Sequence, residues 1–216
     1  MVLQKFVGIL IALLLVSTTF MPAVAAQSDG QQDEKCAPTM ETKLISDDGT
    51  VSTYTSTYKI SDTKTRYFYI KKTIQILSNG TETGTVLVYE LDANGNVIGD
   101  GFGKDSTYSI DSGGNVQIHI GPIDVEYLRS GGEIATGSFA TWLAVAGIFS
   151  EGVAIVVAGA IAFVFIIASY YWTNNDGSMD LYIPYASLLL FPAAIIDPAP
   201  IPIPIMVKNQ WTVLIL

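Results

Sequence analysis

The chain has few of the residues from which common catalytic and metal sites are built. Its 216 residues include one histidine, His119, and one cysteine, Cys36. These two side chains are too few for an ordinary His/Cys zinc site, and a single cysteine excludes an internal disulfide. The G-x-S-x-G pattern of a nucleophile elbow is also absent. We therefore expect a protein that is not an enzyme and that carries no cofactor.

Charged residues are scarce as well. They make up 14% of the chain, against roughly 25% in an average soluble domain, and hydrophobic residues make up 50%. The formal net charge of -9 repels phosphate backbones, so we expect no nucleic-acid partner. It also gives no attraction to anionic lipid headgroups, so any affinity for a lipid bilayer must come from apolar burial.

Residues 1–26 have the three parts of a secretory signal peptide. Lys5 supplies the charge, residues 6–16 form a short apolar run, and small residues at 23–25 form a cleavage site. The sequence therefore predicts export, to the extracellular space or to a membrane-associated place at the cell surface. Residues 27–41, which include Cys36, are polar and aperiodic and predict a disordered lead-in.

Residues 42–128 are rich in Thr, Tyr, Ile and Val and have frequent turn signals, which predicts a β-rich extracellular domain. The clearest strand covers residues 66–77, where apolar and polar side chains alternate. Lys72 interrupts its apolar face, which predicts a bulge or a sheet edge at that point. The pattern favours a small antiparallel sandwich or a curled sheet.

Four features of this domain have a chemical interpretation and a simpler one. His119 lies on the polar face of a predicted strand, where we expect a solvated side chain. The glycine-rich stretch 99–104 lacks the spacing of a phosphate loop and predicts a flexible turn. The oxygen-bearing residues from Asp92 to Asp100 fit a hairpin better than a calcium loop. Asn79 begins a glycosylation sequon on a predicted turn.

After a Gly-rich linker at 129–138, the hydrophobic helical segment 139–173 follows. Residues 152–172 carry no charge. This uncharged segment is long enough to span a bilayer as a helix. Aromatic residues near both ends are typical of the membrane interface. The residues predicted to insert into a membrane are Trp142, Glu151, Gly152, Ala154, Ala158, Ala162, Tyr170, Tyr171 and Trp172.

Two geometries of this segment fit a membrane. One is a single spanning helix at 152–172 with a short interfacial helix before it, and the other is a helical hairpin with Glu151 at its tip. The alternative is a buried core helix of a soluble protein. A stripe of small residues predicts close approach of a second helix and self-association. The stripe consists of Ser150, Ala154, Ala158 and Ala162.

Residues 174–216 form an apolar tail. Residues 180–185 predict a short edge strand, the alternating prolines from Pro198 to Pro204 predict an extended polyproline-like rod, and residues 210–216 predict a final strand. The complete sequence thus predicts the α+β class, with a β-sandwich-like domain, a transmembrane-like helix or helical hairpin, and an extended Pro-rich tail.

The order of signal, acidic sheet domain, Gly/Ala-rich hydrophobic helix and apolar tail resembles that of bacteriocin-like secreted proteins. The hydrophobic C-terminal third favours a secreted, non-enzymatic protein that inserts into the lipid bilayer with antimicrobial or pore-forming activity, and the acidic sheet domain is then its carrier or receptor-binding part. The alternative function is a cell-surface β-domain that is anchored by residues 152–172 and has an adhesive or envelope-structural role.

Overall fold

The structure, a computed structural model, describes residues 37–130, 132–196 and 201–215, and within 163–171, 195, 196 and 215 it describes the backbone alone. The predicted signal peptide, Cys36 and most of the predicted lead-in lie outside the described residues. The strands are β1 (Thr39–Asp47), β2 (Val51–Ser61), β3 (Lys64–Ile76), β4 (Glu82–Leu91), β5 (Val97–Phe102), β6 (Thr107–Ile110), β7 (Val116–Ile120), β8 (Met179–Ile183), β9 (Pro202–Val207) and β10 (Gln210–Ile215). The helices are α3 (Pro122–Arg129), α4 (Gly132–Val145), α5 (Glu151–Trp172), α6 (Tyr185–Leu188) and α7 (Phe191–Ile196).

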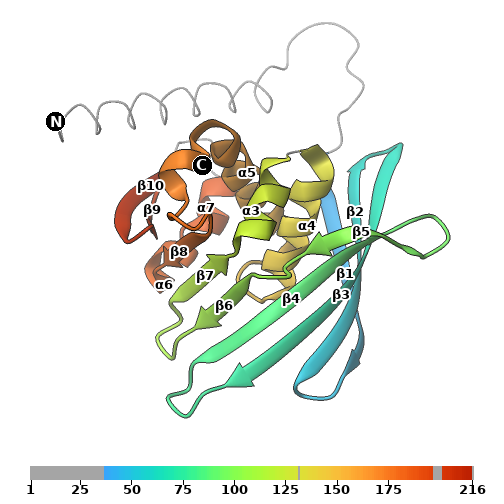
Figure 1. Cartoon of the computed structure of the whole chain (residues 1–216), viewed down its shortest axis with the longest axis horizontal. Coiled ribbons are helices and arrows are strands. Elements are labelled where there is room, and N and C mark those ends of the chain that lie inside the picture. The colour runs from blue at the N-terminus through green and yellow to red at the C-terminus, as the bar shows by residue number, and fades with distance from the viewer. Residues whose placement is uncertain (1–36, 131, 197–200, 216) are drawn as a thin grey trace, which may run out of the picture.

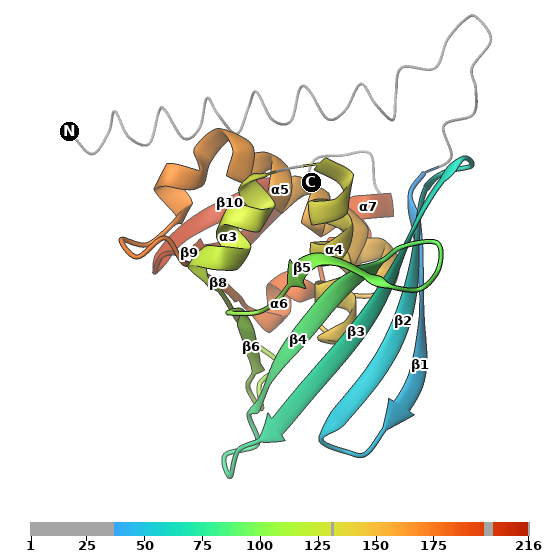
Figure 2. The same cartoon turned by 45° about the vertical axis from the view of Figure 1, so that its right-hand side comes forward.

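All the described strands belong to one antiparallel sheet, with the order β1-β2-β3-β4-β6-β7-β8-β9-β10 and with β5 paired to β4. The sheet curves around the helices, which lie on its inner face (Figures 1 and 2). The α+β class with a β-rich domain is confirmed. The predicted segments 42–128 and 174–216 both contribute strands to this one sheet, and buried side chains of 139–173 share one core with them.

The alternation of side chains predicted for the strand at 66–77 is present in β3. Phe68 and Ile70 are fully buried on the inner face, whereas Tyr67 and Tyr69 are exposed on the outer face. This period of two residues is what a strand with one covered and one solvated face requires.

The prediction of a bulge or a sheet edge at Lys72 is wrong. The pairing of β3 with β4 continues without a shift through Lys72 and Val86, and β3 lies between β2 and β4. Its side chain points inward and is only 14% exposed, with Nζ 3.5 Å from a carboxylate oxygen of Glu82. Nζ also donates to the carbonyl of Ala146 at 3.3 Å and lies 5.5 Å from the centre of the Tyr108 ring. Lys72 is therefore a cation that stabilises the carbonyl end of α4 from within the sheet.

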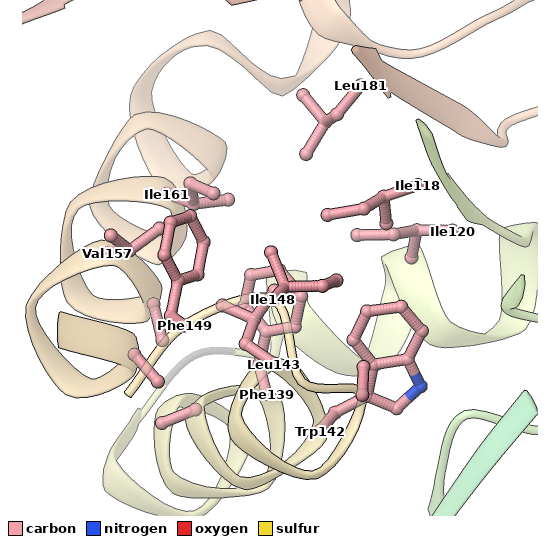
Figure 3. Close-up of a cluster of buried hydrophobic side chains, with 14 of the residues drawn as sticks. Ile118, Ile120, Phe139, Trp142, Leu143, Ile148, Phe149, Val157, Ile161 and Leu181 are labelled. Atoms are coloured by element: carbon pink, nitrogen blue, oxygen red, sulfur yellow. The ribbon is translucent and has the colours of Figure 1, made fainter. Parts of the chain in front are cut away.

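The core lies between the sheet and the pair α4 and α5. The chain turns between these helices at residues 146–150, where Gly147 takes a positive φ of 82°. Buried side chains from both helices, their connection, β7 and β8 point toward one another (Figure 3). The residues labelled there are Ile118, Ile120, Phe139, Trp142, Leu143, Ile148, Phe149, Val157, Ile161 and Leu181.

A reciprocal pair of aspartates fixes the start of α3. Asp105 accepts hydrogen bonds from the backbone N–H groups of Ile123 and Asp124, at 3.0 and 3.3 Å. The fully buried Asp124 accepts in return from Gly103 N–H at 2.9 Å and from the hydroxyl of Ser106 at 2.6 Å. Burial, with the second carboxylate nearby, raises the pKa of Asp124 above its ordinary value. These bonds hold the loop between β5 and β6 against the helix.

The tail differs from two predictions. The strand predicted at 180–185 exists as β8, but it pairs with both β7 and β9 and is not an edge. Pro202 and Pro204 lie in strand β9, not in a polyproline-like rod, because β10 pairs with β9 along its length. Pro198 and Pro200 lie outside the described residues. The predicted final strand is confirmed as β10.

Candidate functional site

The side chains predicted to insert into a membrane lie largely inside the protein. Trp142 is fully buried, and its ring packs edge-to-face against Phe102 and Tyr108 at centroid distances of 6.4 and 5.9 Å. Trp172 is half-buried and packs against the core. Gly152 is exposed. The side chains of Tyr170 and Tyr171 lie outside the described set.

The small-residue stripe also faces the core. Ala154 and Ala158 are fully buried and Ala162 is 6% exposed, whereas Ser150 is exposed. In this conformation the close approach that small residues permit is made within the chain, between α5 and its own neighbours. A second copy could reach Ala154 and Ala158 only if α5 left the sheet.

Glu151 joins the start of α5 to the edge of the sheet. One of its carboxylate oxygens accepts the backbone N–H of Thr42 in β1 at 2.6 Å. Across the part of the chain that the structure describes, no helix combines the length and the hydropathy that crossing a membrane requires.

The outer face of the sheet carries a different candidate site, which sequence reasoning missed. An open groove of about 760 Å³ lies across the strands from β3 to β9, on the face opposite the helices. Six of its outward side chains form one continuous cross-strand row, with one residue each from β3, β4, β6, β7, β8 and β9. In order the row is Gln75, Thr83, Ser109, Gln117, Tyr182 and Met206. We call this set the outer row.

The outer row consists mainly of hydroxyl and amide groups that have few partners in the protein. Among the described contacts, only a long bond of 3.4 Å from Thr83 to the carbonyl of Gln75 uses one of its hydroxyls. The side chains of Ser109 and Gln117 make no hydrogen bond to a described residue, and Gln117 is exposed. These groups are free to hydrogen-bond to a molecule in the groove.

A His–Asp pair lies in the next row of the same groove. His119 Nδ1 is 2.8 Å from a carboxylate oxygen of Asp180, its register partner in β8. The other carboxylate oxygen of Asp180 accepts from the side-chain amide of Asn174 at 2.7 Å. Thr107 is the register partner of His119 on the other side. The predicted polar-face position of His119 is confirmed, but its partner Asp180 was not predicted, because Asp180 lies 61 residues later in the chain.

The residues that the sequence offered for calcium binding and for glycosylation make local contacts in and near turns. Asp92 accepts hydrogen bonds from the backbone and side chain of Asn96, and Asp100 pairs with Lys104 at 3.1 Å. The carboxylates of Asp92 and Asp100 are thus engaged by neighbouring residues of the chain. Within the described residues, no group of three or more His, Cys, Asp or Glu side chains is placed to hold a metal ion. Asn79 is exposed in the β3–β4 turn, where its side-chain oxygen accepts Thr81 N–H at 3.0 Å.

The sequence and the structure were compared with protein-family models, with curated proteins and with solved structures. None of the three comparisons finds a match.

Proposed function

We propose that the protein is an exported, non-enzymatic binding protein with an adhesive role, and that it holds an extracellular ligand on the outer face of its sheet. The groove carries this proposal. It is open to solvent, it has the size of a ligand site, and the hydroxyl and amide groups that line it have few hydrogen-bond partners among the described residues.

Binding is favoured over catalysis because the groove lacks an activated nucleophile. His119 is held by Asp180, as a general base would be. However, no hydrogen bond among the described residues joins the imidazole to the hydroxyl of Thr107 or Ser109. A nucleophile and its base normally lie within hydrogen-bond reach of each other.

Membrane insertion is the second candidate, and the apolar character of α5 is the observation that favours it. The described part of α5 contains one charged residue, Glu151, at its first position. Insertion would require α4 and α5 to leave the sheet, which exposes the apolar inner face and breaks the bond between Glu151 and Thr42. Because this opening costs free energy, we rank it below binding by the groove.

The proposal predicts that blocking the groove abolishes attachment to cells. We would compare co-sedimentation of the full chain with envelope fragments of the producing cells and with neutral phospholipid vesicles. Gln117→Arg places a long cation in the groove, and Thr57→Arg places the same cation on the outer face of β2, outside the groove.

Binding of the wild type and of Thr57→Arg to envelope fragments, with loss of binding in Gln117→Arg, is the expected result. Equal binding of all three chains to envelope fragments would overturn the role of the groove. Sedimentation with the vesicles that persists in Gln117→Arg would instead support membrane insertion.

A further inference from the structure

We infer that the groove binds a neutral, hydroxyl-rich glycan chain, an inference that rests on the proposed role of the outer face in binding. The strand register, the charge of the lining and the placement of aromatic side chains point to this ligand class.

The charge of the groove lining excludes acidic ligands. The lining of the groove contains no lysine and no arginine, and its one carboxylate, Asp180, is already paired with His119. The chain as a whole has a net charge of -9. A phosphorylated, sulfated or uronic-acid polymer would meet repulsion without a basic partner. A strongly cationic ligand would find a single carboxylate that is already engaged. A neutral ligand fits best.

The outer row offers hydrogen-bonding groups that both donate and accept. The amides of Gln75 and Gln117 and the hydroxyls of Thr83 and Ser109 each supply donor and acceptor capacity. Sugar hydroxyl groups have the same dual character, so each can exchange two hydrogen bonds with such a side chain. Neighbouring strands are about 4.8 Å apart, so the row presents one polar group per strand at a regular interval. A polymer with a short, regular repeat can use every position.

An extended peptide fits this surface less well. Peptides usually add to a sheet at an open edge, where unpaired backbone groups supply the hydrogen bonds. The groove lies over β4, β6, β7 and β8, which all have a paired strand on each side. Their backbone groups are used within the sheet, so a ligand here meets side chains only.

Aromatic side chains continue the outer row at one end. Tyr182 is part of the row, and Met206 is the register partner of Trp211 in β10. Trp211 is 63% exposed and lies on the same outer face, since the alternate residues Ile205 and Val207 of β9 are buried. An exposed ring next to a polar ladder gives the C–H face of a sugar a surface on which to stack.

The test is electrophoresis of the full chain in native gels that contain a soluble polysaccharide. The neutral probes are hydroxyethyl cellulose, galactomannan, soluble starch and the neutral polysaccharide fraction of the producing cells, and alginate is the acidic comparison. The variants are Gln117→Ala and Trp211→Ala, with Thr57→Ala as the matched control on the same face outside the groove.

We expect at least one neutral probe to retard the wild type and Thr57→Ala equally, and alginate to have no effect. Losing one hydrogen bond in Gln117→Ala should weaken binding about threefold to tenfold, and Trp211→Ala should weaken it at least as much. Circular dichroism of each variant shows whether it is folded. If a variant does not fold, Ser109→Ala and Tyr182→Phe test the same row with smaller changes.

Two results would overturn the inference. Envelope binding that Gln117→Arg abolishes, without retardation by any neutral polysaccharide, would leave the groove as a binding site and reject a glycan as its ligand. Retardation that is equal in Gln117→Ala, Trp211→Ala and the control would place glycan binding outside the groove and reject the inference, while the envelope assay with Gln117→Arg tests the proposed function of the groove separately.

Discussion

Glu151 and Thr42 connect the first turn of α5 to the first strand of the sheet. The carboxylate oxygen of Glu151 accepts the backbone N–H of Thr42 at 2.6 Å. The carboxylate also lies at a helix N-terminus, where the partial positive charge of the helix favours it. The sequence suggested this residue as the tip of a membrane hairpin, whereas in the structure it bonds the helix to the sheet.

Glu151→Ala should therefore destabilise the folded protein. Thr42 N–H is part of a half-buried contact, and leaving such a donor without a partner costs about 1–3 kcal/mol. Glu151→Gln keeps an acceptor oxygen and should lose less. The measurement is urea unfolding followed by tryptophan fluorescence. Glu126→Ala, at an exposed position of α3, is the control and should change stability by less than about 0.5 kcal/mol. An effect of Glu151→Ala as small as that of Glu126→Ala would contradict the role of the bond.

Two neighbouring positions of α5 test whether this helix faces protein or lipid. Ala158 is fully buried, whereas Val156 is 38% exposed. Ala158→Lys would bury an unpaired cation and should prevent folding or cost about 3–5 kcal/mol. Val156→Lys leaves the new charge in water and should cost less than about 1 kcal/mol. Thermal unfolding in solution without lipid is the measurement. A small and equal loss at both positions would show that α5 does not pack on the sheet, and would favour the membrane hypothesis.

The inward cation of β3 gives a third prediction. Lys72 contacts Glu82 at 3.5 Å and the carbonyl of Ala146 at 3.3 Å. Lys72→Met keeps the length of the side chain and removes both contacts, at an expected cost of about 1–3 kcal/mol. In a double-mutant cycle, Lys72→Met should cost less stability in the Glu82→Gln background than in the wild type, since the two side chains interact. Strict additivity of the two changes would contradict the pairing. Lys59→Met, in an exposed ion pair with Asp62, is the control.

Local sequence patterns predicted the strands well, but they could not predict which distant residues contact one another in the fold. The alternation around Phe68 and the turn at Asn94-Gly95 are properties of neighbouring residues, and β3 and the β4–β5 hairpin lie where the sequence places them. Lys72 was misread because its partner Glu82 lies on the next strand and its other acceptor lies at the end of α4. No local period contains that information.

The hydrophobic segment shows the same limit. An uncharged run such as 152–172 has the composition of a membrane span and equally that of a helix enclosed by protein. The choice depends on whether the rest of the chain can cover it. Here the tail, for which the sequence predicted an extended Pro-rich form, supplies β8, β9 and β10, which complete the sheet around the helices (Figure 2). The outer row could not be predicted from the sequence either, because its members lie far apart in the chain and only the strand register aligns them.

The β6–β7 turn gives a prediction for acidic pH. The carboxylate of Asp111 accepts from the side-chain amide and the backbone N–H of Asn115, at 2.8 and 2.9 Å, and from Gly113 N–H at 2.8 Å. These hydrogen bonds, with the Asn115 side chain first, lower the pKa of Asp111 below its ordinary value of 3.8. The folded protein therefore binds this proton less readily than the unfolded chain does. The stabilisation is fully present above that ordinary value and is lost as pH falls through the lowered pKa.

Asp111→Ala should consequently lower the midpoint of thermal unfolding at pH 6, and the difference from the wild type should shrink as pH falls below about 4. Comparing the two chains at each pH cancels the titration of every other group that they share. Ser112→Ala, in the same turn, makes no such contacts with the described residues and serves as the control, with an unchanged difference at every pH. If the difference between Asp111→Ala and the wild type stays constant from pH 6 to pH 3, the carboxylate does not supply the stability of this turn, and the hydrogen bonds to Asn115 do not hold the hairpin that carries Ser109 and Gln117 into the groove.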